Sequence, residues 1–259
     1  MEPYLPNYLK GKNRRLVFDL LRERGQMSRA EITRDTGMSF PTAMKVVDAF
    51  LEKGLLVELD ETGPAAGAGR KGRLLRFEPG AYRAVGVECE GRFARVGLAD
   101  MAGGVQARET IELGDFARTR DLSPLAAAIR RMCAAANGAP VLGVCIGFPA
   151  NLDPDAAAIV SYAAMDIQQP TSFAQVFPAF WREVELPVYL ENDANLACEG
   201  EAFLRRGAGG AANMLYLSIG SGCGGAVRLD GKLRRGARCR AGEVGAMLLQ
   251  PALGAPGRS

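Results

Sequence analysis

Asn192 and Asp193 place an amide beside a carboxylate at the end of the apolar run LPVYLEND. Such a pair is a common way to hold a sugar hydroxyl, and a carboxylate can also remove a proton from one. The chain contains no histidine, which excludes Ser-His-Asp and Cys-His catalysis and every zinc site that needs an imidazole. Any general base must therefore be a carboxylate or a lysine whose pKa is shifted.

A glycine-rich stretch, YLSIGSGCGGAVRLDGKLRRG, is the second candidate for chemistry. Glycines beside a hydroxyl on a turn let the backbone approach a phosphate and donate N–H groups to it. The residues concerned are Gly220, Ser221, Gly222, Gly224 and Gly225. Glycine turns in β structure also occur for structural reasons alone, so this motif by itself leaves both interpretations open.

Alternating strands and helices are predicted to position these residues. Apolar runs predict strands, and apolar residues at helical spacing predict helices. We expect strands at 82–90, 93–100, 104–113, 140–149 and 186–192, and helices at 123–137, at 172–185 with an interruption at Pro178, and at 193–207. This alternation predicts an α/β layer with a mixed sheet. Because Asp193 opens the last helix, a helix N-cap is the structural alternative to a ligand role for its carboxylate.

The first eighty residues have a different texture. Apolar residues recur at helical spacing over 13–25, which predicts a helix. In the following stretch, MSRAEITRDTG, Ser28 and Glu31 have the spacing of a capping box, and Gly37 is placed to end a short second helix. Two consecutive helices joined by a short turn are thus expected.

A third helix is predicted within MSFPTAMKVVDAFLEKG, with Ser39 as its N-cap and Pro41 in its first turn. Its apolar face is predicted to comprise Phe40, Met44, Val47, Phe50 and Leu51. The opposite face is predicted to carry Thr42, Lys45 and Ala49. This face would be available for a partner.

Three helices, the last two joined at Gly37, predict a helix-turn-helix whose third helix enters the major groove with its N-terminal end. GLLVELD and RLLRFEP predict a strand and its return, and the basic, glycine-rich loop between them predicts a wing. DNA contacts are expected from Ser39, Thr42, Lys45, Arg70, Lys71 and Arg73. The alternative is a small helical domain with a solvated basic loop, but capping, turn and wing together favour DNA binding.

Composition agrees with this division. Residues 1–80 carry 14 lysines and arginines against 11 acidic residues, whereas residues 81–259 carry 18 of each, so the net charge of +3 lies where a nucleic-acid contact is expected. The six cysteines form no CxxC pair, which is typical of reduced packing residues. No run has the length and apolarity of a membrane helix or a signal peptide, so we expect a cytoplasmic protein with no membrane partner.

The order of these segments resembles the ROK family of bacterial repressors and sugar kinases. The resemblance covers nearly the whole chain and is carried by VCIGFPA, LPVYLENDANLACEGEA, YLSIGSGCGGAVRLDGKLRRG and AGEVGAM. It implies a two-lobed α/β fold of the actin-like ATPase, sugar kinase type, and a winged helix in front marks the regulator branch. We therefore expect an α+β winged helix-turn-helix domain at 1–80 and a sugar kinase-like domain at 81–259.

The resemblance also implies roles for particular residues. Asn192 and Asp193 match the family's sugar-contacting pair, in which the aspartate is the general base that activates a sugar hydroxyl for attack on the γ-phosphate of ATP. Glu243 matches a carboxylate that binds sugar hydroxyls. Residues 220–225 match the second phosphate loop, and Gly91 is a remnant of the first.

The first phosphate loop departs from the family pattern. In the family it reads like Asp-x-Gly-Gly-Thr, whereas this chain has ECEGR at 88–92. Glu90 adds bulk and negative charge where phosphates would lie, and Arg92 would offset that charge only in part. Binding of ATP and Mg²⁺ is therefore not expected.

The C-terminal part departs as well. Ala246 stands where the family has a histidine for sugar and zinc, and the family's cysteine cluster does not follow. No structural zinc and no other cofactor is therefore expected. The chain ends in LLQPALGAPGRS, so the second lobe is expected to be incomplete, which would leave sheet edge and apolar surface uncovered.

Three functions fit these observations. The favoured one is a transcriptional regulator, a repressor that binds operator DNA as a homodimer and is gated by a sugar or sugar phosphate through linked equilibria. The second is a hexose kinase that uses Asp193 as base and ATP as phosphoryl donor, which the altered first phosphate loop disfavours. The third is a paralogue that binds DNA constitutively and no longer senses sugar.

Overall fold

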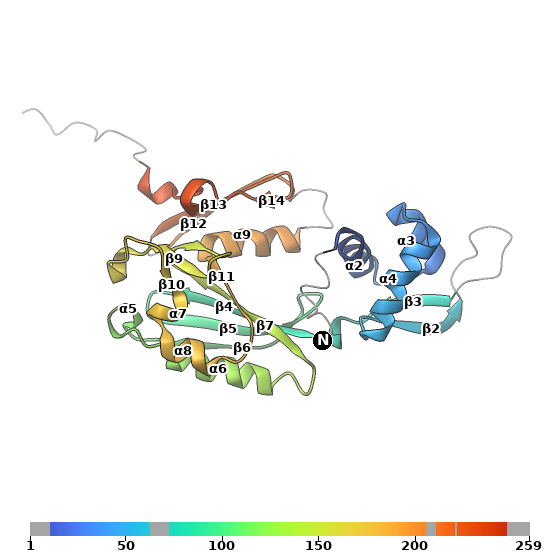
Figure 1. Ribbon diagram of the computed structural model, residues 1–259, viewed down its shortest axis with the longest axis horizontal. Coiled ribbons are helices and arrows are strands. Elements are labelled where there is room, and N and C mark those ends of the chain that lie inside the picture. The colour runs from blue at the N-terminus through green and yellow to red at the C-terminus, as the bar shows by residue number, and fades with distance from the viewer. Residues whose placement is uncertain (1–10, 63–72, 206–210, 221, 248–259) are drawn as a thin grey trace, which may run out of the picture. The chain divides into compact units, whose positions relative to one another are not determined.

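The structure is a computed structural model (Figure 1) and describes residues 11–62, 73–205, 211–220 and 222–247. No helix within these ranges is long and apolar enough to cross a membrane. By its contacts the chain divides into two compact units. One unit comprises Met1–Val85, Gly97–Glu109 and Ile129–Val144, and the other comprises Gly86–Val96, Thr110–Ala128 and Cys145–Ser259.

The described residues from 11 to 62 and from 73 to 77 form three helices and three antiparallel strands. The helices are α2 (Lys12–Arg24), α3 (Arg29–Thr36) and α4 (Phe40–Glu52), and the strands are β1 (Gln26–Ser28), β2 (Leu56–Thr62) and β3 (Arg73–Phe77). The strand order is β1-β3-β2, and the 3-10 turn η1 (Pro79–Ala81) follows. The three predicted helices and the strand pair are confirmed. Strand β1 was missed because three residues are too few to show an alternating pattern.

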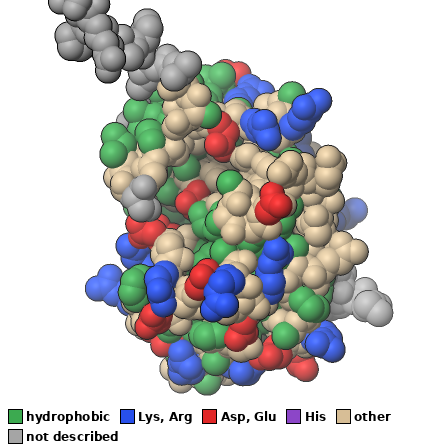
Figure 2. Space-filling model, turned by 90° about the vertical axis from the view of Figure 1, so that its left-hand side faces the viewer, with side chains coloured by type: hydrophobic (Ala, Val, Ile, Leu, Met, Phe, Trp, Pro, Cys, Tyr) green, Lys and Arg blue, Asp and Glu red, His purple; other side chains and the backbone are tan. Residues whose placement is uncertain are grey.

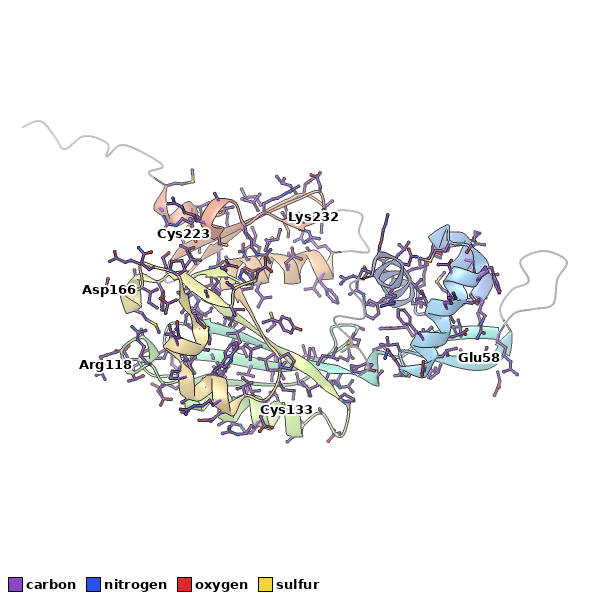
Figure 3. The ribbon with its side chains drawn as sticks, viewed as in Figure 1. Glu58, Arg118, Cys133, Asp166, Cys223 and Lys232 are labelled. Carbon is purple, nitrogen blue, oxygen red and sulfur yellow. The ribbon has the colours of Figure 1, made fainter. Side chains whose placement is uncertain are left out.

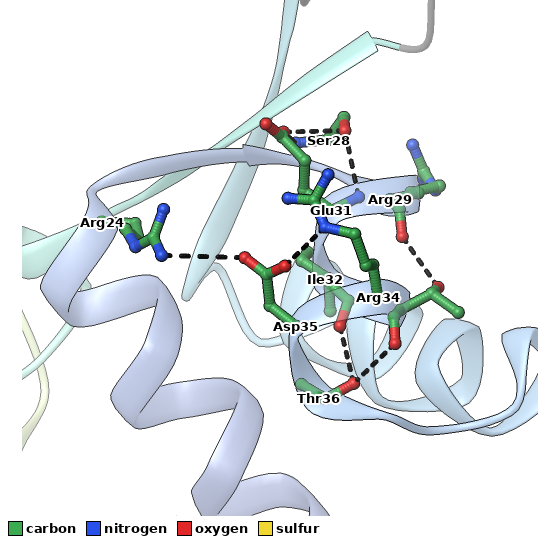
Figure 4. Close-up of polar contacts among 9 residues, drawn as sticks. Arg24, Ser28, Arg29, Glu31, Ile32, Arg34, Asp35 and Thr36 are labelled. Atoms are coloured by element: carbon green, nitrogen blue, oxygen red, sulfur yellow. Dashed lines mark hydrogen bonds and ion pairs between the residues drawn. The ribbon is translucent and has the colours of Figure 1, made fainter. Parts of the chain in front are cut away.

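Local capping explains where α3 begins and ends (Figure 4). Ser28 Oγ accepts a hydrogen bond from Glu31 N at 3.3 Å, and Glu31 Oε2 accepts one from Ser28 N at 2.8 Å. Gly37 then adopts a left-handed conformation with φ 66°, which favours glycine. The predicted capping box and helix end are confirmed, as is the N-cap of α4, where Ser39 Oγ accepts from Thr42 N at 3.4 Å.

The helices and the small sheet enclose one apolar core. Its buried residues come from every element of this region and include Val17, Leu21, Ile32, Val47, Phe50, Leu55 and Leu75. The predicted apolar face of α4 was wrong at one end, because Phe40 is 56% exposed while Ala43 and Val46 are buried. Phe40 is the first residue of the helix, where no neighbouring element covers it.

Replacing Ser28 by alanine is expected to lower the free energy of unfolding by about 1 kcal/mol, the usual cost of losing an N-cap. Hydrogen bonds from the Ser28 backbone and side chain lower the pKa of Glu31. That contribution is therefore present above the ordinary glutamate pKa and is lost as the pH falls through the folded value. Denaturant unfolding should show a smaller loss of stability for Ser28→Ala at pH 3 than at pH 7. Ser28→Thr keeps the hydroxyl acceptor and should lower the free energy of unfolding much less.

A five-stranded sheet follows in the chain. Its order is β11-β7-β4-β5-β6, in which three consecutive strands are neighbours and the other two are reached by crossovers. The strands are β4 (Arg83–Glu90), β5 (Phe93–Asp100), β6 (Val105–Glu112), β7 (Val141–Phe148) and β11 (Val188–Asn192). The helices between them are α5 (Phe116–Thr119), α6 (Ser123–Ala134), α7 (Phe173–Val176) and α8 (Pro178–Glu183). All five predicted strands are confirmed, as is the interruption before Pro178.

Two smaller antiparallel sheets complete the described structure. One contains β8 (Asn151–Asp153), β9 (Ala158–Ser161) and β10 (Thr171–Ser172). The 3-10 turn η2 (Ala163–Met165) lies between β9 and β10 in the chain. The other contains β12 (Met214–Ile219), β13 (Cys223–Leu229) and β14 (Lys232–Leu233), and α9 (Asp193–Leu204) and the 3-10 turn η5 (Val244–Ala246) lie against it. The 3-10 turn η4 (Ala237–Cys239) lies against β8. Figure 3 marks the start of β13 at Cys223 and the short return strand at Lys232. The strands β8 to β10 were not predicted.

An aromatic cluster fixes the end of β7. The ring of Phe148, which is fully buried, lies 5.4 to 5.9 Å from the rings of Phe116, Tyr162, Phe173 and Phe177. Edge-to-face packing of this kind adds to the burial of each ring. The end of β7 lies beside the junction of β11 and α9, since a Cβ atom built on Gly147 would be 3.5 Å from Asp193 Cα.

Strand β12 presents an apolar face to solvent. Leu215, Leu217 and Ile219 are 63%, 52% and 83% exposed, and they alternate with the half-buried Met214 and Tyr216. On the face drawn in Figure 2, hydrophobic side chains gather at the upper left, whereas acidic and basic side chains are interspersed lower down.

Candidate functional site

The junction of β11 and α9 holds the Asn192–Asp193 pair. Asn192 is the N-cap of α9, since its Oδ1 accepts a hydrogen bond from Asn195 N at 3.1 Å. Its Nδ2 donates to the carbonyl oxygen of Ala150 at 3.3 Å. The structural alternative for Asp193, a helix N-cap, was therefore wrong by one residue. The extended backbone of Asn192 places its side chain in the capping position, so Asp193 is the first residue of the helix proper.

The Asp193 carboxyl group does not cap the helix, because Asn192 occupies the N-cap position. Asp193 Oδ1 accepts a hydrogen bond from Ala194 N at 2.9 Å. Burial raises the pKa of Asp193, with a further upward contribution from the negative charge of Glu88, against the lowering effect of backbone hydrogen bonds. A hydrogen bond from the Asn192 side chain also lowers the pKa of this carboxyl group. A half-buried carboxyl group with a raised pKa is suited to accept a hydrogen bond from a hydroxyl.

The chain brings Glu243 toward this carboxyl group. Glu243 precedes η5, and burial raises its pKa, while Arg240 lowers it and the charge of Asp193 raises it. Asp193 likewise contributes to the raised pKa of the buried Cys89 thiol, which burial, the largest cause, takes to about 12. The two carboxylates that were predicted to bind a sugar, 50 positions apart in sequence, thus lie within electrostatic range of one another.

The turn between β4 and β5 carries the altered first phosphate loop. Gly91 has φ 56°, as a tight turn requires. Arg95 bridges two glutamates, with Nη1 2.7 Å from Glu88 Oε2 and Nη2 2.8 Å from Glu90 Oε2. The expectation that Arg92 would offset the charge of Glu90 was wrong, because Arg92 pairs with Glu112 at 3.5 Å. Arg92 lies in the turn before β5, whereas Arg95 lies within β5, where its side chain reaches both glutamates.

The second glycine loop lies close to the first. A Cβ atom built on Gly220 would be 3.8 Å from Glu90 Oε1, and Gly220 N donates to the carbonyl oxygen of Gly222 at 2.9 Å. The carboxylate of Glu90 therefore stands beside the turn that the resemblance assigns to phosphate. Ser221 lies outside the described residues. Gly224 and Gly225 were placed near this turn by the sequence, but they lie within β13, opposite Ser218 and Leu217.

Two neighbouring glycines of β13 offer a test of whether packing requires them. A Cβ atom on Gly225 would lie 2.9 Å from the carbonyl oxygen of Gly242 and 3.0 Å from that of Tyr216, whereas on Gly224 the nearest atom is Ala194 Cβ at 3.6 Å. We expect Gly225→Ala to lower the free energy of unfolding by about 1 to 3 kcal/mol. Gly224→Ala, the matched control, should change it by well under 1 kcal/mol. Equal effects in denaturant unfolding would contradict this prediction.

An ion pair that sequence reasoning missed supports the junction. The Glu191 carboxylate is buried, and its Oε2 accepts hydrogen bonds from Arg235 Nε at 3.0 Å and Nη2 at 2.5 Å. Its Oε1 accepts from Asn192 N and from Asn195 Nδ2, both at 3.0 Å. Glu191 therefore ties the Asn192 backbone and the start of α9 to the segment after β14. A charged residue inside the apolar run VYLEN was the only signal in the sequence.

The residues predicted to contact DNA lie on several elements. Ser39 and Lys45 are exposed and Thr42 is half-exposed, all within the first turns of α4. The hydroxyls of Ser39 and Thr42 lie 2.8 Å apart and share a hydrogen bond. Arg73 begins β3 and is exposed, although it pairs with Glu58 on β2 at 3.3 Å. Arg70 and Lys71 lie outside the described residues.

Metal ligands do not gather in the described part of the chain. No three His, Cys, Asp or Glu side chains there lie close enough to hold a metal ion. The absence of zinc and of other cofactors stays a prediction.

An α/β domain with a glycine-rich hairpin beside a strand-to-helix carboxylate is the arrangement of a sugar-kinase-type protein. The ROK family profile matches residues 84–258, and the chain belongs to this family. A crystal structure of a ROK family transcriptional regulator, a homologue of the E. coli MLC protein, aligns with 93% of this chain and 60% of that one at 18% identity, with a TM-score of 0.73. The fold is thus of the actin-like sugar kinase type, as expected.

Curated relatives include both repressors and kinases. A xylose repressor of Caldicellulosiruptor bescii is 27% identical over 241 residues, which cover 92% of this chain and 58% of the relative. A glucokinase of Halalkalibacterium halodurans is 36% identical over 120 residues, which cover 45% of this chain and 34% of the kinase. The chain thus spans about three-fifths of the length of the repressor. The repressor match extends along nearly the whole chain, whereas the kinase match covers less than half.

Proposed function

We propose that this protein is a sugar-gated transcriptional repressor, with a winged helix-turn-helix at residues 1–80 and a sugar-binding ROK domain at 81–259. The observation that carries the proposal is the extent of the repressor match, which takes in the N-terminal elements as well as the family domain. These elements follow in the order helix, short strand, helix, helix, strand, strand, with Gly37 in the turn before α4. This is the element order of a winged helix.

The DNA-binding surface would be the exposed side of α4. Ser39, Thr42 and Lys45 occupy its N-terminal half, the end that a recognition helix inserts into the major groove. Phe40 is also exposed there, so an apolar contact with a thymine methyl group is available beside the polar ones. Arg70, Lys71 and Arg73 would contact phosphates or the minor groove from the wing.

The sugar would bind at the junction of β11 and α9. Asp193 and Glu243 would accept hydrogen bonds from its hydroxyl groups, and the Asn192 amide would contact the sugar beside them. The Asp193 carboxyl group is partly desolvated, a state that strengthens hydrogen bonds to a ligand, whereas Glu243 is exposed and so is accessible to one. Glu90 stands next to Gly220 and would oppose a nucleotide phosphate there, so Asp193 would grip the ligand rather than act as a base.

Gating then follows from linkage. A sugar that binds more tightly to one arrangement of the protein shifts the population that is competent to bind DNA. A homodimer on a palindromic operator would set two recognition helices about one helical turn, roughly 34 Å, apart. Such a repressor would act in the cytoplasm and would need no metal or nucleotide cofactor.

Fluorescence anisotropy with the DNA upstream of the protein's own gene tests the proposal. Binding would be measured at two salt concentrations, alone and with a panel of pentoses, hexoses, amino sugars and their phosphates. D-xylose comes first because several relatives are named xylose repressors. Specific binding that one sugar weakens or strengthens is the expected result. No specific binding at low salt would refute the proposal.

The same panel separates the alternatives. Specific DNA binding that no sugar changes would indicate a constitutive DNA-binding paralogue. Sugar-dependent consumption of Mg-ATP would indicate a kinase, the function that the raised pKa of Asp193 and the glucokinase match favour. With the unmodified protein we expect neither.

A further inference from the structure

A basic pocket opens where the start of α2 meets the N-terminal half of α4. Its volume is about 430 Å³, and it is lined by Gly11, Lys12, Asn13, Arg14, Thr42, Lys45 and Val46. Three of these seven residues are cationic and none is acidic. Val46 is buried, whereas Lys12, Asn13 and Lys45 are exposed, so an apolar residue forms part of the wall and charged groups stand at the mouth.

The first turn of α2 is basic. Cations at Lys12, Arg14 and Arg15 crowd its N-terminal end, the first turn holds no acidic residue, and no side chain caps it. Positive charge at this end opposes the helix dipole and costs stability. Arg15 is paired with Asp19, Nε to Oδ2, at 2.8 Å, but it does not line the pocket. The cations of the pocket therefore converge from two helices on a space that suits an anion.

We propose that this pocket seats a backbone phosphate of the operator DNA, which rests on the proposed function of α4 as the recognition helix. Thr42 and Lys45 belong both to the pocket and to the surface expected to face DNA. The DNA strand that borders the major groove beside α4 would place one of its phosphates at the pocket. Lys12, Arg14 and Lys45 would neutralise that phosphate. The first helix of a helix-turn-helix commonly crosses the DNA backbone. The contact would fix the register of α4 without reading sequence.

The test is the salt dependence of DNA binding by the full chain. Each phosphate neutralised by the protein contributes about 0.9 to the slope of log K against log salt concentration. Lys12→Gln is expected to reduce that slope by about one and to weaken binding by about tenfold at low salt, equally for operator and unrelated duplex. Arg15→Gln is the matched control, because it removes the same charge from the same helix outside the pocket and should leave the slope nearly unchanged.

Asn13→Asp separates binding from folding. An acidic residue in the first turn of α2 favours the helix dipole, so thermal stability should hold or rise while DNA affinity falls by about tenfold or more. A slope that Lys12→Gln leaves unchanged, or that Arg15→Gln changes as much, would overturn the phosphate seat while the repressor proposal stands. Failure of the unmodified protein to bind DNA specifically would overturn both.

Discussion

Asp193→Asn is expected to weaken sugar binding by about 10- to 100-fold, the usual worth of a hydrogen bond to a charged acceptor. The Asn192 cap and the Ala194 N–H bond survive the change, because an asparagine oxygen can still accept from Ala194 N. The measurement is the thermal shift produced by whichever sugar stabilises the unmodified protein, since a ligand that binds the folded state must raise its stability. The shift should be lost at a sugar concentration that saturates the unmodified protein.

The same variant should be no less stable without sugar. Because burial raises the pKa of Asp193, the folded state disfavours its ionised form, and stability falls as the pH rises from about 4 through the folded pKa. Asparagine lacks this penalty, so its advantage should appear above that window and vanish below about pH 4. Asp166→Asn, on an exposed turn of the same unit, is the matched control. It should alter neither the thermal shift produced by the sugar nor the pH dependence of stability. A full sugar shift in Asp193→Asn would contradict the role of this carboxylate.

Arg235→Met is expected to lower the free energy of unfolding by about 2 to 3 kcal/mol, because it leaves the Glu191 carboxylate buried without its cation. The Glu191 side chain is 10% exposed and that of Arg235 is 43% exposed, so water reaches one partner and holds the loss toward the low end. Since Glu191 also orders the Asn192 backbone, the sugar-induced shift should weaken as well. Denaturant unfolding and sugar titration measure the two effects.

The neighbouring arginine supplies the control. Arg234 pairs with Asp230 at 3.0 Å, and the Asp230 side chain is 82% exposed, so Arg234→Met should cost less than about 0.5 kcal/mol. The double variant Glu191→Gln/Arg235→Met removes the unpaired charge and should recover part of the lost stability. If both arginine substitutions lowered the free energy of unfolding equally, the buried Glu191–Arg235 pair would contribute no more to stability than the exposed pair.

Interactions within a few residues were predictable from the sequence. The Ser28–Glu31 capping box, the left-handed Gly37 and the Ser39 cap were all foreseen and are all present. A cap joins a side chain to a backbone N–H two or three residues away, so the residue types at that spacing are enough to specify it. The strands of the central sheet were foreseen for a similar reason, since their apolar runs record burial on the sheet.

Pairings between distant residues were missed. Arg95, not Arg92, neutralises Glu88 and Glu90, because Arg95 lies within β5, where its side chain reaches both glutamates, whereas Arg92 lies in the turn before that strand. Glu191 and Arg235 meet across 44 positions in the chain, and no local pattern marks either as a partner of the other. Such contacts depend on strand register and crossover, which are properties of the whole fold.

The sequence by itself determined the family membership, the order of the longer helices and strands, and the residue types available for chemistry, including the absence of histidine. Only the tertiary structure decided which carboxyl groups are desolvated and which are neutralised. It placed Asn192 rather than Asp193 in the N-cap position, so the Asp193 carboxylate does not cap the helix. It also set Glu90 beside Gly220. Burial and electrostatic fields arise from groups brought together by folding, so a residue's chemistry here follows from its neighbours in space more than from its neighbours in sequence.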